Sequence, residues 1–307
     1  MKDELKNLQV EFLSYLKNER GFSNHTIKSY SNDLNIFIEY CLSTFSDDFD
    51  IDLIDNKTLN RFKGGQMEKG FSSNTINRRM SSIKSFFRYL YNLEIIKDNP
   101  AKYLHNLKVE KRLPDFIPEN KIIELMNAPL DEKRGLIITN KIEGYRDKAI
   151  LELFYATGLR LSELININIC DVDKEKQNVK VMGKGGKERI VPIGKVALYS
   201  IESYLKMLGK SINNNFMDPI FVNKKGNRLP KRTLQRRITK YLNVIMEGTS
   251  VHTLRHTFAS HLINEGADIL TIKELLGHSS ISSTGIYTKL ETEKVKKVYQ
   301  DKHPHGK

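Results

Sequence analysis

The sequence has 307 residues and a formal net charge of +13, and its 39% hydrophobic and 28% charged content is typical of a packed globular protein. It holds no apolar run of the ~20 residues that span a bilayer, and its polar first residues, 1–10, do not resemble a secretory signal. The two cysteines, Cys41 and Cys170, are too few for a disulfide framework or a thiolate metal site, and they fit a reducing cytoplasm. The length predicts two domains, and the lack of a long apolar run predicts that there is no membrane anchor.

The excess of basic residues favours a polyanionic partner, and nucleic acid is the commonest one. A merely basic globular protein would carry the same net charge. A membrane surface would also attract it, although that interpretation needs an amphipathic or apolar anchor. The distribution of the basic residues along the chain therefore matters more than their number.

Residues 1–108 follow a helical pattern and are expected to form a small helical domain. Apolar residues recur at helical spacing over 5–16 and again over 27–41. A third helix is expected at about 55–67, and a fourth begins after Ser72 or Ser73.

The fourth helix has a second face without acidic residues. No Asp or Glu occurs over 70–93, where the basic residues are Arg78, Arg79, Lys84 and Arg88. A charged helix face is commonly just solvated. Small polar residues between the bases favour phosphate contacts instead, so these four are candidate DNA-binding residues.

Residues 109–118 carry charges and two prolines without periodicity, which indicates a linker. A second domain is expected over 119–307, with helices near 119–127, 146–156 and 159–165. Alternation over 179–182 and 189–193, on both sides of a glycine-rich turn, predicts a β-hairpin.

After Gly194 the pattern is helical to the C-terminus, and the predicted fold class is therefore mainly α with a small β-hairpin or sheet (α+β). From Val222 to Met246 there are eight Lys or Arg residues and no Asp or Glu. Three of them, on a predicted helix, are candidate DNA-binding residues: Arg232, Arg236 and Arg237.

The segment H-T-L-R-H at 252–256 places His252, Arg255 and His256 close together on a helix. The spacing of the two histidines is that of a helical zinc pair, but the glutamate that would act as general base is replaced by Thr253. A metal-dependent nuclease is therefore one open alternative. Two structural histidines beside an arginine are another.

The segment T-G-L-R-L-S-E-L at 157–164 puts Arg160 after a glycine turn, where a helix begins. An arginine there can hold a phosphate, and Glu163 can orient a neighbouring group. An ordinary surface arginine with an intrahelical ion pair would fit the same pattern.

Two further segments are weak when taken alone. G-K-G-G-K-E-R at 183–189 joins two predicted strands and lacks the Ser or Thr of an ATP-binding phosphate loop. Its Lys184 could reach DNA or supply a proton, or could belong to a solvated turn. Tyr287 lies nine positions after His278, which is in L-L-G-H-S-S, and a lone tyrosine at helical spacing is commonly part of a core or an interface.

Taken together and in this order, the segments resemble the tyrosine recombinases, or phage integrase family, and most closely the bacterial Xer chromosome-dimer resolvases. The similarity runs over nearly the whole chain. It implies an N-terminal four-helix SAM-like core-binding domain and a C-terminal catalytic domain. It also implies catalytic roles for Arg160, Lys184, His252, Arg255, His278 and Tyr287, with Glu163 in support.

The resemblance implies that Tyr287 attacks a DNA phosphate and forms a 3′-phosphotyrosyl bond, with no metal, ATP or other cofactor. It further implies a homo- or hetero-tetramer on double-stranded DNA sites, with exchange of C-terminal tails. Gly285 departs from the family pattern and should loosen the segment before the nucleophile. A mobile-element integrase and a non-catalytic DNA-binding accessory protein stay open as alternatives.

Overall fold

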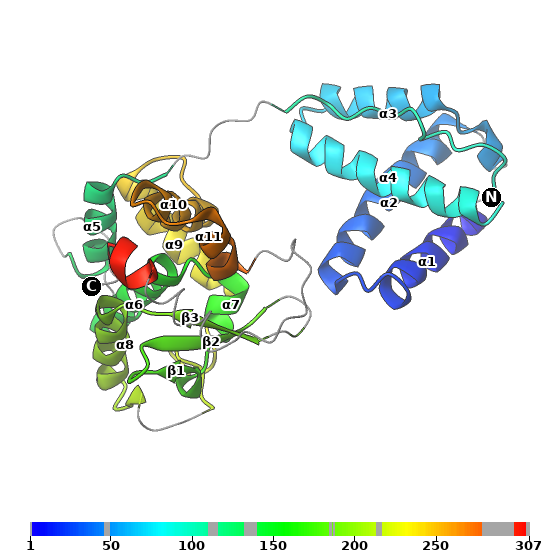
Figure 1. Cartoon of the computed structure of the whole chain (residues 1–307). Helices are drawn as coiled ribbons and strands as arrows, with labels where there is room; N and C mark the ends of the chain where they lie inside the picture. The colour runs from blue at the N-terminus through cyan, green and yellow to red at the C-terminus, as the bar shows by residue number, and fades with distance from the viewer. Residues whose placement is uncertain are drawn as a thin grey trace. The chain divides into compact units, whose positions relative to one another are not determined.

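The computed structural model describes residues 2–45, 50–109, 116–131, 140–183, 186, 188–212, 217–277 and 298–304. The chain divides into two compact units, residues 1–111 and 112–307, and Figure 1 shows each of them. The first unit is helical, and the second combines helices with a small sheet.

In the first unit, the predicted helices are confirmed as α1 (Lys2–Asn18), α2 (Asn24–Thr44), α3 (Asn56–Glu68) and α4 (Ser73–Asn92). A short 3₁₀ turn, η1, covers Ile51–Leu53. Side-chain caps at Ser23, Asp55 and Ser72 accept backbone N–H groups at the starts of α2, α3 and α4. The apolar stripes of the four helices meet in one core that is rich in phenylalanine.

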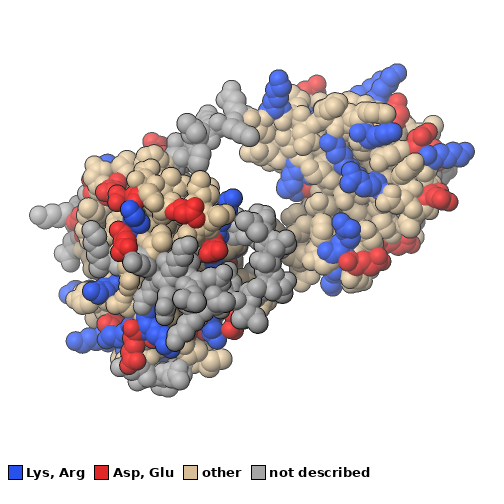
Figure 2. Space-filling model, viewed as in Figure 1, with Lys and Arg blue, Asp and Glu red and all other residues tan. Residues whose placement is uncertain are grey.

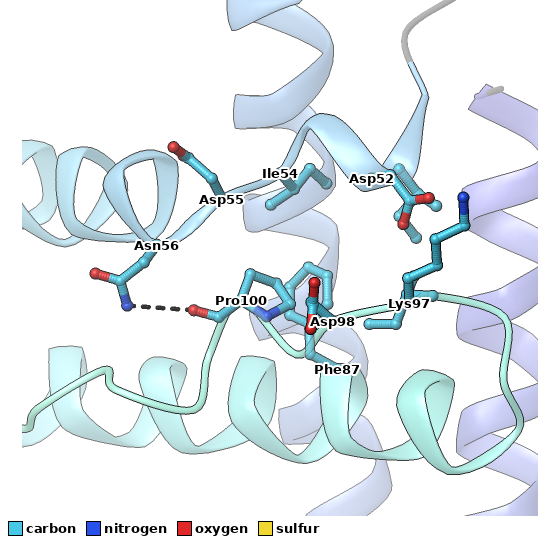
Figure 3. A pocket seen from close by; sticks show the side chains of 10 residues that line it. Asp52, Ile54, Asp55, Asn56, Phe87, Lys97, Asp98 and Pro100 are labelled. Carbon is cyan, nitrogen blue, oxygen red and sulfur yellow. Dashed lines mark hydrogen bonds between the residues drawn. The ribbon is translucent and has the colours of Figure 1, made fainter.

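One hollow of about 370 Å³ opens on this unit between η1, the start of α3 and residues 96–100. Figure 3 shows Asp52, Asp55 and Asp98 among the residues that line it, and Asn56 donating a hydrogen bond to the Pro100 carbonyl. With three carboxylates against Lys97 alone, this hollow repels an anion. The hollow is therefore not a candidate phosphate-binding site.

The second unit has three expected helices near its start: α5 (Glu119–Asn127), α6 (Lys141–Thr157) and α7 (Leu161–Asn166), with a 3₁₀ turn, η2 (Ala128–Leu130), after α5. Later helices are α8 (Lys195–Met207), α9 (Lys231–Ile245), α10 (Val251–Asn264) and α11 (Ile269–Leu276). Most of α6 is buried, and it contacts α5, α8 and α10. It is the central helix of this unit, with α10 and α11 on one side and the strands on the other (Figure 1).

The predicted hairpin is confirmed as β2 (Asn178–Met182) paired antiparallel with β3 (Glu188–Pro192), so that Val181 faces Arg189. A two-residue strand, β1 (Val172–Asp173), follows the 3₁₀ turn η4 (Ile169–Asp171) and pairs with β2. Within the described residues the sheet has three strands in the order β1-β2-β3, of which the sequence located β2 and β3; the small sheet agrees with the predicted fold class.

The expectation of helix throughout after Gly194 was wrong between α8 and α9. Described residues there form two isolated β-bridges, Asn168 with Pro219 and Val222 with Arg228. The Arg228 guanidinium donates to the carbonyl of Ile165 and to Asn168 Oδ1, each at 2.6 Å. Tertiary hydrogen bonds therefore replace a regular helix in this segment.

Gly158 ends α6 with a left-handed backbone, φ +57°. A Cβ atom at this position would lie inside the van der Waals contact distance of the Phe258 ring on α10. The residue must therefore be glycine both for its backbone conformation and for the close approach of two helices. The turn it forms places Arg160 at the start of α7.

Gly158→Ala is expected to lower the free energy of unfolding by about 2–3 kcal/mol, because left-handed strain of about 1–2 kcal/mol adds to overpacking of at least about 1 kcal/mol. Urea denaturation measures the loss. Gly209→Ala is the matched control, since Gly209 also has a positive φ but nothing within 4 Å of the added Cβ. Equal losses in the two variants would show that the Phe258 contact has no effect.

Candidate active site

Arg160 occupies the N-cap position of α7, directly after the Gly158 turn. Its backbone N–H donates to Glu163 Oε2 at 2.8 Å, and its Nη1 donates to Glu163 Oε1 at 2.9 Å. Its Nη2 reaches across to the carbonyl of Gly277, at 3.1 Å. The side chain is 38% exposed. The guanidinium is thus fixed on one side and open on the other.

Arg255 approaches the same place from α10. Its Nη1 donates to the carbonyl of Gly158, and its Nη2 donates to the carbonyl of Leu276 at 2.6 Å. Arg160 and Arg255 therefore bond to consecutive carbonyls, those of Leu276 and Gly277, at the C-terminal end of α11. The structure brings these two sequence-predicted residues together.

Glu163 is the carboxylate of this site, and its side chain is 5% exposed. It accepts hydrogen bonds from Arg160 and also from Arg189 on β3, whose Nη1 and Nη2 lie 3.1 and 2.9 Å from its two oxygens. Burial alone would raise the pKa of Glu163, but the bonds from Arg189 and Arg160 hold it below its ordinary value. Glu163 is therefore ionised at neutral pH.

Sequence reasoning missed Arg189. The alternation of β3 contained a signal for it, because Arg189 and the buried Val191 lie two positions apart on one face of the strand. An arginine on a buried strand face needs an anionic partner, and Glu163 is that partner.

Three guanidiniums and one carboxylate meet here, which leaves an excess of positive charge. Burial and the neighbouring Arg160 lower the pKa of Arg255 to about 10. An arginine with this pKa is still protonated at neutral pH, but its charge is incompletely compensated. The site is suited to bind an anion with two or three oxygens.

His252 lies on the first turn of α10, one turn before Arg255, and is exposed. A hydrogen bond from the Ser250 N–H to Thr253 Oγ1, at 3.1 Å, helps to start this helix. Lys184, His278 and Tyr287 lie outside the described residues. The chain after Gly277, which Arg160 contacts, continues directly to His278.

Within the described residues, no group of three or more His, Cys, Asp or Glu side chains could hold a metal ion. Among these residues, His252 and His256 are therefore not part of such a group. No described helix is long and apolar enough to cross a membrane.

Three of the four candidate DNA-binding residues on α4 are at least partly exposed, and the fourth, Arg79, is buried. Arg78 and Arg88 are exposed, although Arg78 Nη1 also donates to the buried carboxylate of Asp33. Lys84 is half-buried, with its Nζ 3.1 Å from Asn106 Oδ1. Figure 2 shows a group of Lys and Arg side chains across the middle of the visible face of this unit, with Asp and Glu mostly toward its margins.

Arg79 is a correction to that set. It is 7% exposed, donates a hydrogen bond to the buried Gln66, and lies 4.1 Å from the centroid of the Phe71 ring. Buried polar groups take internal partners, and this arginine joins α4 to α3. It is a structural residue and cannot contact DNA on the surface.

On α9, Arg232 and Arg236 are exposed, as a DNA contact requires. Arg237 is a second correction, because its charge is compensated inside the domain. Its Nε donates to Asp147 Oδ2 and its Nη2 pairs with Glu143 at 3.2 Å. The basic run therefore contributes fewer free charges than the sequence suggested.

Asp147→Ala is expected to lower the free energy of unfolding by about 3 kcal/mol or more, because it leaves a buried cation unpaired. Asp147 is 1% exposed and accepts from Arg146, Arg237 and the Tyr241 hydroxyl. Arg146 is only 4% exposed. Chemical denaturation measures the effect.

Asp218→Ala is the control for this prediction. It breaks an ion pair with Lys210 in which the aspartate side chain is 51% exposed, and exposed pairs contribute only about 0–1 kcal/mol. A loss at Asp147 no larger than that at Asp218 would contradict the importance of the buried network.

The sequence is similar to one family of known proteins over nearly its whole length. Residues 116–294 match the phage integrase family, and residues 10–93 match the phage integrase N-terminal SAM-like domain. Tyrosine recombinase XerC of Thermodesulfovibrio yellowstonii is 38% identical over 305 residues, covering 97% of this chain and 96% of that protein. Tyrosine recombinase XerD of Oceanobacillus iheyensis is 36% identical over 301 residues, covering 96% and 98%.

Solved structures show the same fold. A lambda integrase dimer bound to a COC' core site superposes with a TM-score of 0.69 at 16% identity, covering 92% of this chain and 99% of that one. XerH recombinase bound to palindromic difH substrate, in a post-cleavage complex, gives 0.64 at 22% identity, covering 94% and 83%. At these identities the similarity concerns the fold alone.

Proposed function

Because the chain belongs to the phage integrase family, in which its relatives named above are tyrosine recombinases, we propose that it cuts and rejoins double-stranded DNA through a bond between Tyr287 and a 3′-phosphate. The observation that carries this proposal is the convergence of Arg160 and Arg255 on the end of α11. That helix leads in sequence to His278 and Tyr287.

The two arginines would hold the phosphate that is attacked. Negative charge grows on the non-bridging oxygens during attack, and paired guanidiniums stabilise it without a metal ion. In the described structure Arg160 and Arg255 donate to backbone carbonyls. A phosphate would compete with these carbonyls for the N–H donors. The two guanidiniums that would bind it are already directed to one place.

The remaining steps are proton transfers. A free tyrosine hydroxyl, with a pKa of about 10, is a weak nucleophile at neutral pH and needs a base. We assign His252 to this role, with His278 in support. The 5′-oxygen leaves with a proton from Lys184. The tyrosyl–phosphate bond keeps the energy of the broken bond, so a second 5′-hydroxyl can displace Tyr287 without ATP.

The same proposal covers partners and place of action. The XerH and lambda integrase structures are complexes with DNA, and one holds a lambda integrase tetramer bound to a Holliday junction. We expect this chain to act as a homo- or hetero-tetramer on DNA in the cytoplasm. Arg78, Lys84, Arg88, Arg232 and Arg236 are its candidate DNA contacts, and resolution of chromosome or plasmid dimers is the expected role.

The experiment is a suicide substrate, a duplex nicked near the cleavage point so that the cut strand diffuses away. The DNA site is recovered by crosslinking the chain to the DNA that it binds in cells. We expect a denaturation-resistant adduct that forms equally well in EDTA. Cleavage that stops in EDTA would support a metal-dependent nuclease, and binding without an adduct would support an accessory protein.

Arg255→Lys is expected to make adduct formation fall at alkaline pH. Burial and Arg160 lower the pKa of the guanidinium, and they would lower the pKa of a lysine below its ordinary value of about 10.4. A lysine there loses its charge as pH rises, whereas Arg255 keeps it until about pH 10. Adduct rates from pH 7 to 9.5 measure the difference. Parallel profiles for the two proteins would contradict it.

A further inference from the structure

Arg189 is the one arginine of the site that DNA cannot reach. Its side chain is 9% exposed, so a phosphate at the surface has no access to it. It projects from β3, the second strand of the hairpin, and both of its terminal nitrogens bond to Glu163 on α7. Its action must therefore pass through Glu163.

Glu163 holds four hydrogen bonds that fix both of its oxygens. Oε1 accepts from Arg160 Nη1 and Arg189 Nη1, and Oε2 accepts from the Arg160 N–H and Arg189 Nη2, all at 2.8–3.1 Å. A carboxylate has about four lone-pair positions. Glu163 is thus fully occupied, and its plane is set jointly by the two arginines.

A third element closes against Arg189. A Cβ added at Gly277, at the end of α11, would lie 2.9 Å from Arg189 Cζ. The guanidinium therefore touches the glycine whose carbonyl accepts from Arg160. One buried side chain contacts the strand that follows Lys184 in sequence, the helix of Arg160, and the end of α11.

We propose that Arg189 is a positioning residue, which holds Glu163 so that the Arg160 guanidinium is aimed at the scissile phosphate. The proposal rests on the proposed function, since it assigns Arg160 a phosphate to bind. Lysine cannot replace Arg189, because a single ammonium group cannot occupy both oxygens in the geometry of the planar fork. Arg189→Lys keeps the charge and removes only the orientation.

Arg189→Lys is expected to slow adduct formation about 10- to 100-fold, as losses of side chains that orient active-site groups commonly do. DNA affinity, measured by gel shift, should stay within about threefold, because the Arg189 side chain is 9% exposed and both of its terminal nitrogens bond to Glu163. The decisive measurement is a double-mutant cycle. If Arg189 acts through Arg160, adding Arg189→Lys to Arg160→Ala slows the reaction by less than about threefold more.

Arg228→Lys is the matched control. Arg228 is also a partly buried arginine of this unit with several internal hydrogen bonds, but its partners are Ile165, Ile167 and Asn168. Its effect should multiply with that of Arg160→Ala. Glu163→Gln is a second test variant if Arg189→Lys folds poorly, and it should show the same non-additivity with Arg160→Ala.

Multiplying rate losses for Arg189→Lys and Arg160→Ala would overturn the inference, as would an unchanged rate in a folded Arg189→Lys protein. In both cases the unmodified chain still forms the adduct, and the proposed function stands. Absence of an adduct from the unmodified chain would overturn the proposed function, and this inference with it.

Discussion

Tyr287→Phe is expected to abolish the covalent protein–DNA adduct on a nicked suicide substrate. The change removes one oxygen atom, the proposed nucleophile, and keeps the aromatic ring. Arg160 and Arg255 are untouched, so the phosphate is still held. DNA affinity should therefore stay within about threefold of the unmodified protein, because charge contacts supply most of it.

Tyr199→Phe is the matched control, since Tyr199 is a tyrosine on α8 with 71% of its surface exposed. It should form the adduct at the normal rate. An adduct from Tyr287→Phe, at any appreciable yield, would mean that another residue attacks the phosphate.

Arg255→Ala is expected to slow adduct formation by about 10³-fold or more, in the range found when an arginine that stabilises a phosphoryl transition state is removed. Arg255 is a half-buried cation near the end of α11, and its interactions with the carbonyls of Gly158 and Leu276 hold it in place. Its charge helps most in the transition state. The loss should thus appear in the rate at saturating DNA.

Single-turnover rates at saturating DNA, with affinity measured separately, test this prediction. Lys176→Ala removes an exposed cation from the β1–β2 turn of the same unit, where the side chain is 76% exposed. It should leave the rate unchanged. If Arg255→Ala weakened DNA binding and spared the rate, Arg255 would be a binding residue without a catalytic role.

The helices of the first unit could be predicted because local signals agree there. Apolar spacing predicts four helices there, and Ser72 or Ser73 marks the start of the fourth; the structure confirms the four helices, with ends that differ from the predicted ones by a few residues. The hairpin was predictable for the same reason, because alternation on both sides of a glycine-rich turn has few other outcomes.

Burial of single charged residues was not predictable in this way. Arg79 lies three positions after Ile76 and four before Ile83, on the edge of the buried stripe, but its partner Gln66 is on another helix. Arg237 is compensated by Asp147 of α6, 90 positions away in the chain. A basic run in the sequence shows how many basic residues a segment has. The electrostatic field at the surface depends on which of those charges are paired by tertiary contacts.

The candidate site was predicted in part. Motif order identified Arg160, Glu163 and Arg255, and the structure brings them together. Arg189 ends the G-K-G-G-K-E-R segment but was given no role from the sequence, and its side-chain bonds to Glu163 show the role it has in the site. Strand β1 was not predicted, because two residues are too few to show an alternating pattern. It is defined by its pairing with β2.

The most direct test of the account is the mass of the peptide that remains bound to DNA. After trapping on the suicide substrate, the adduct is digested with nuclease and trypsin. We expect the peptide of residues 274–289, which contains Tyr287, to carry a nucleotide linked through its 3′-phosphate. The same nucleotide on another peptide, or a link through a 5′-phosphate, would contradict the account.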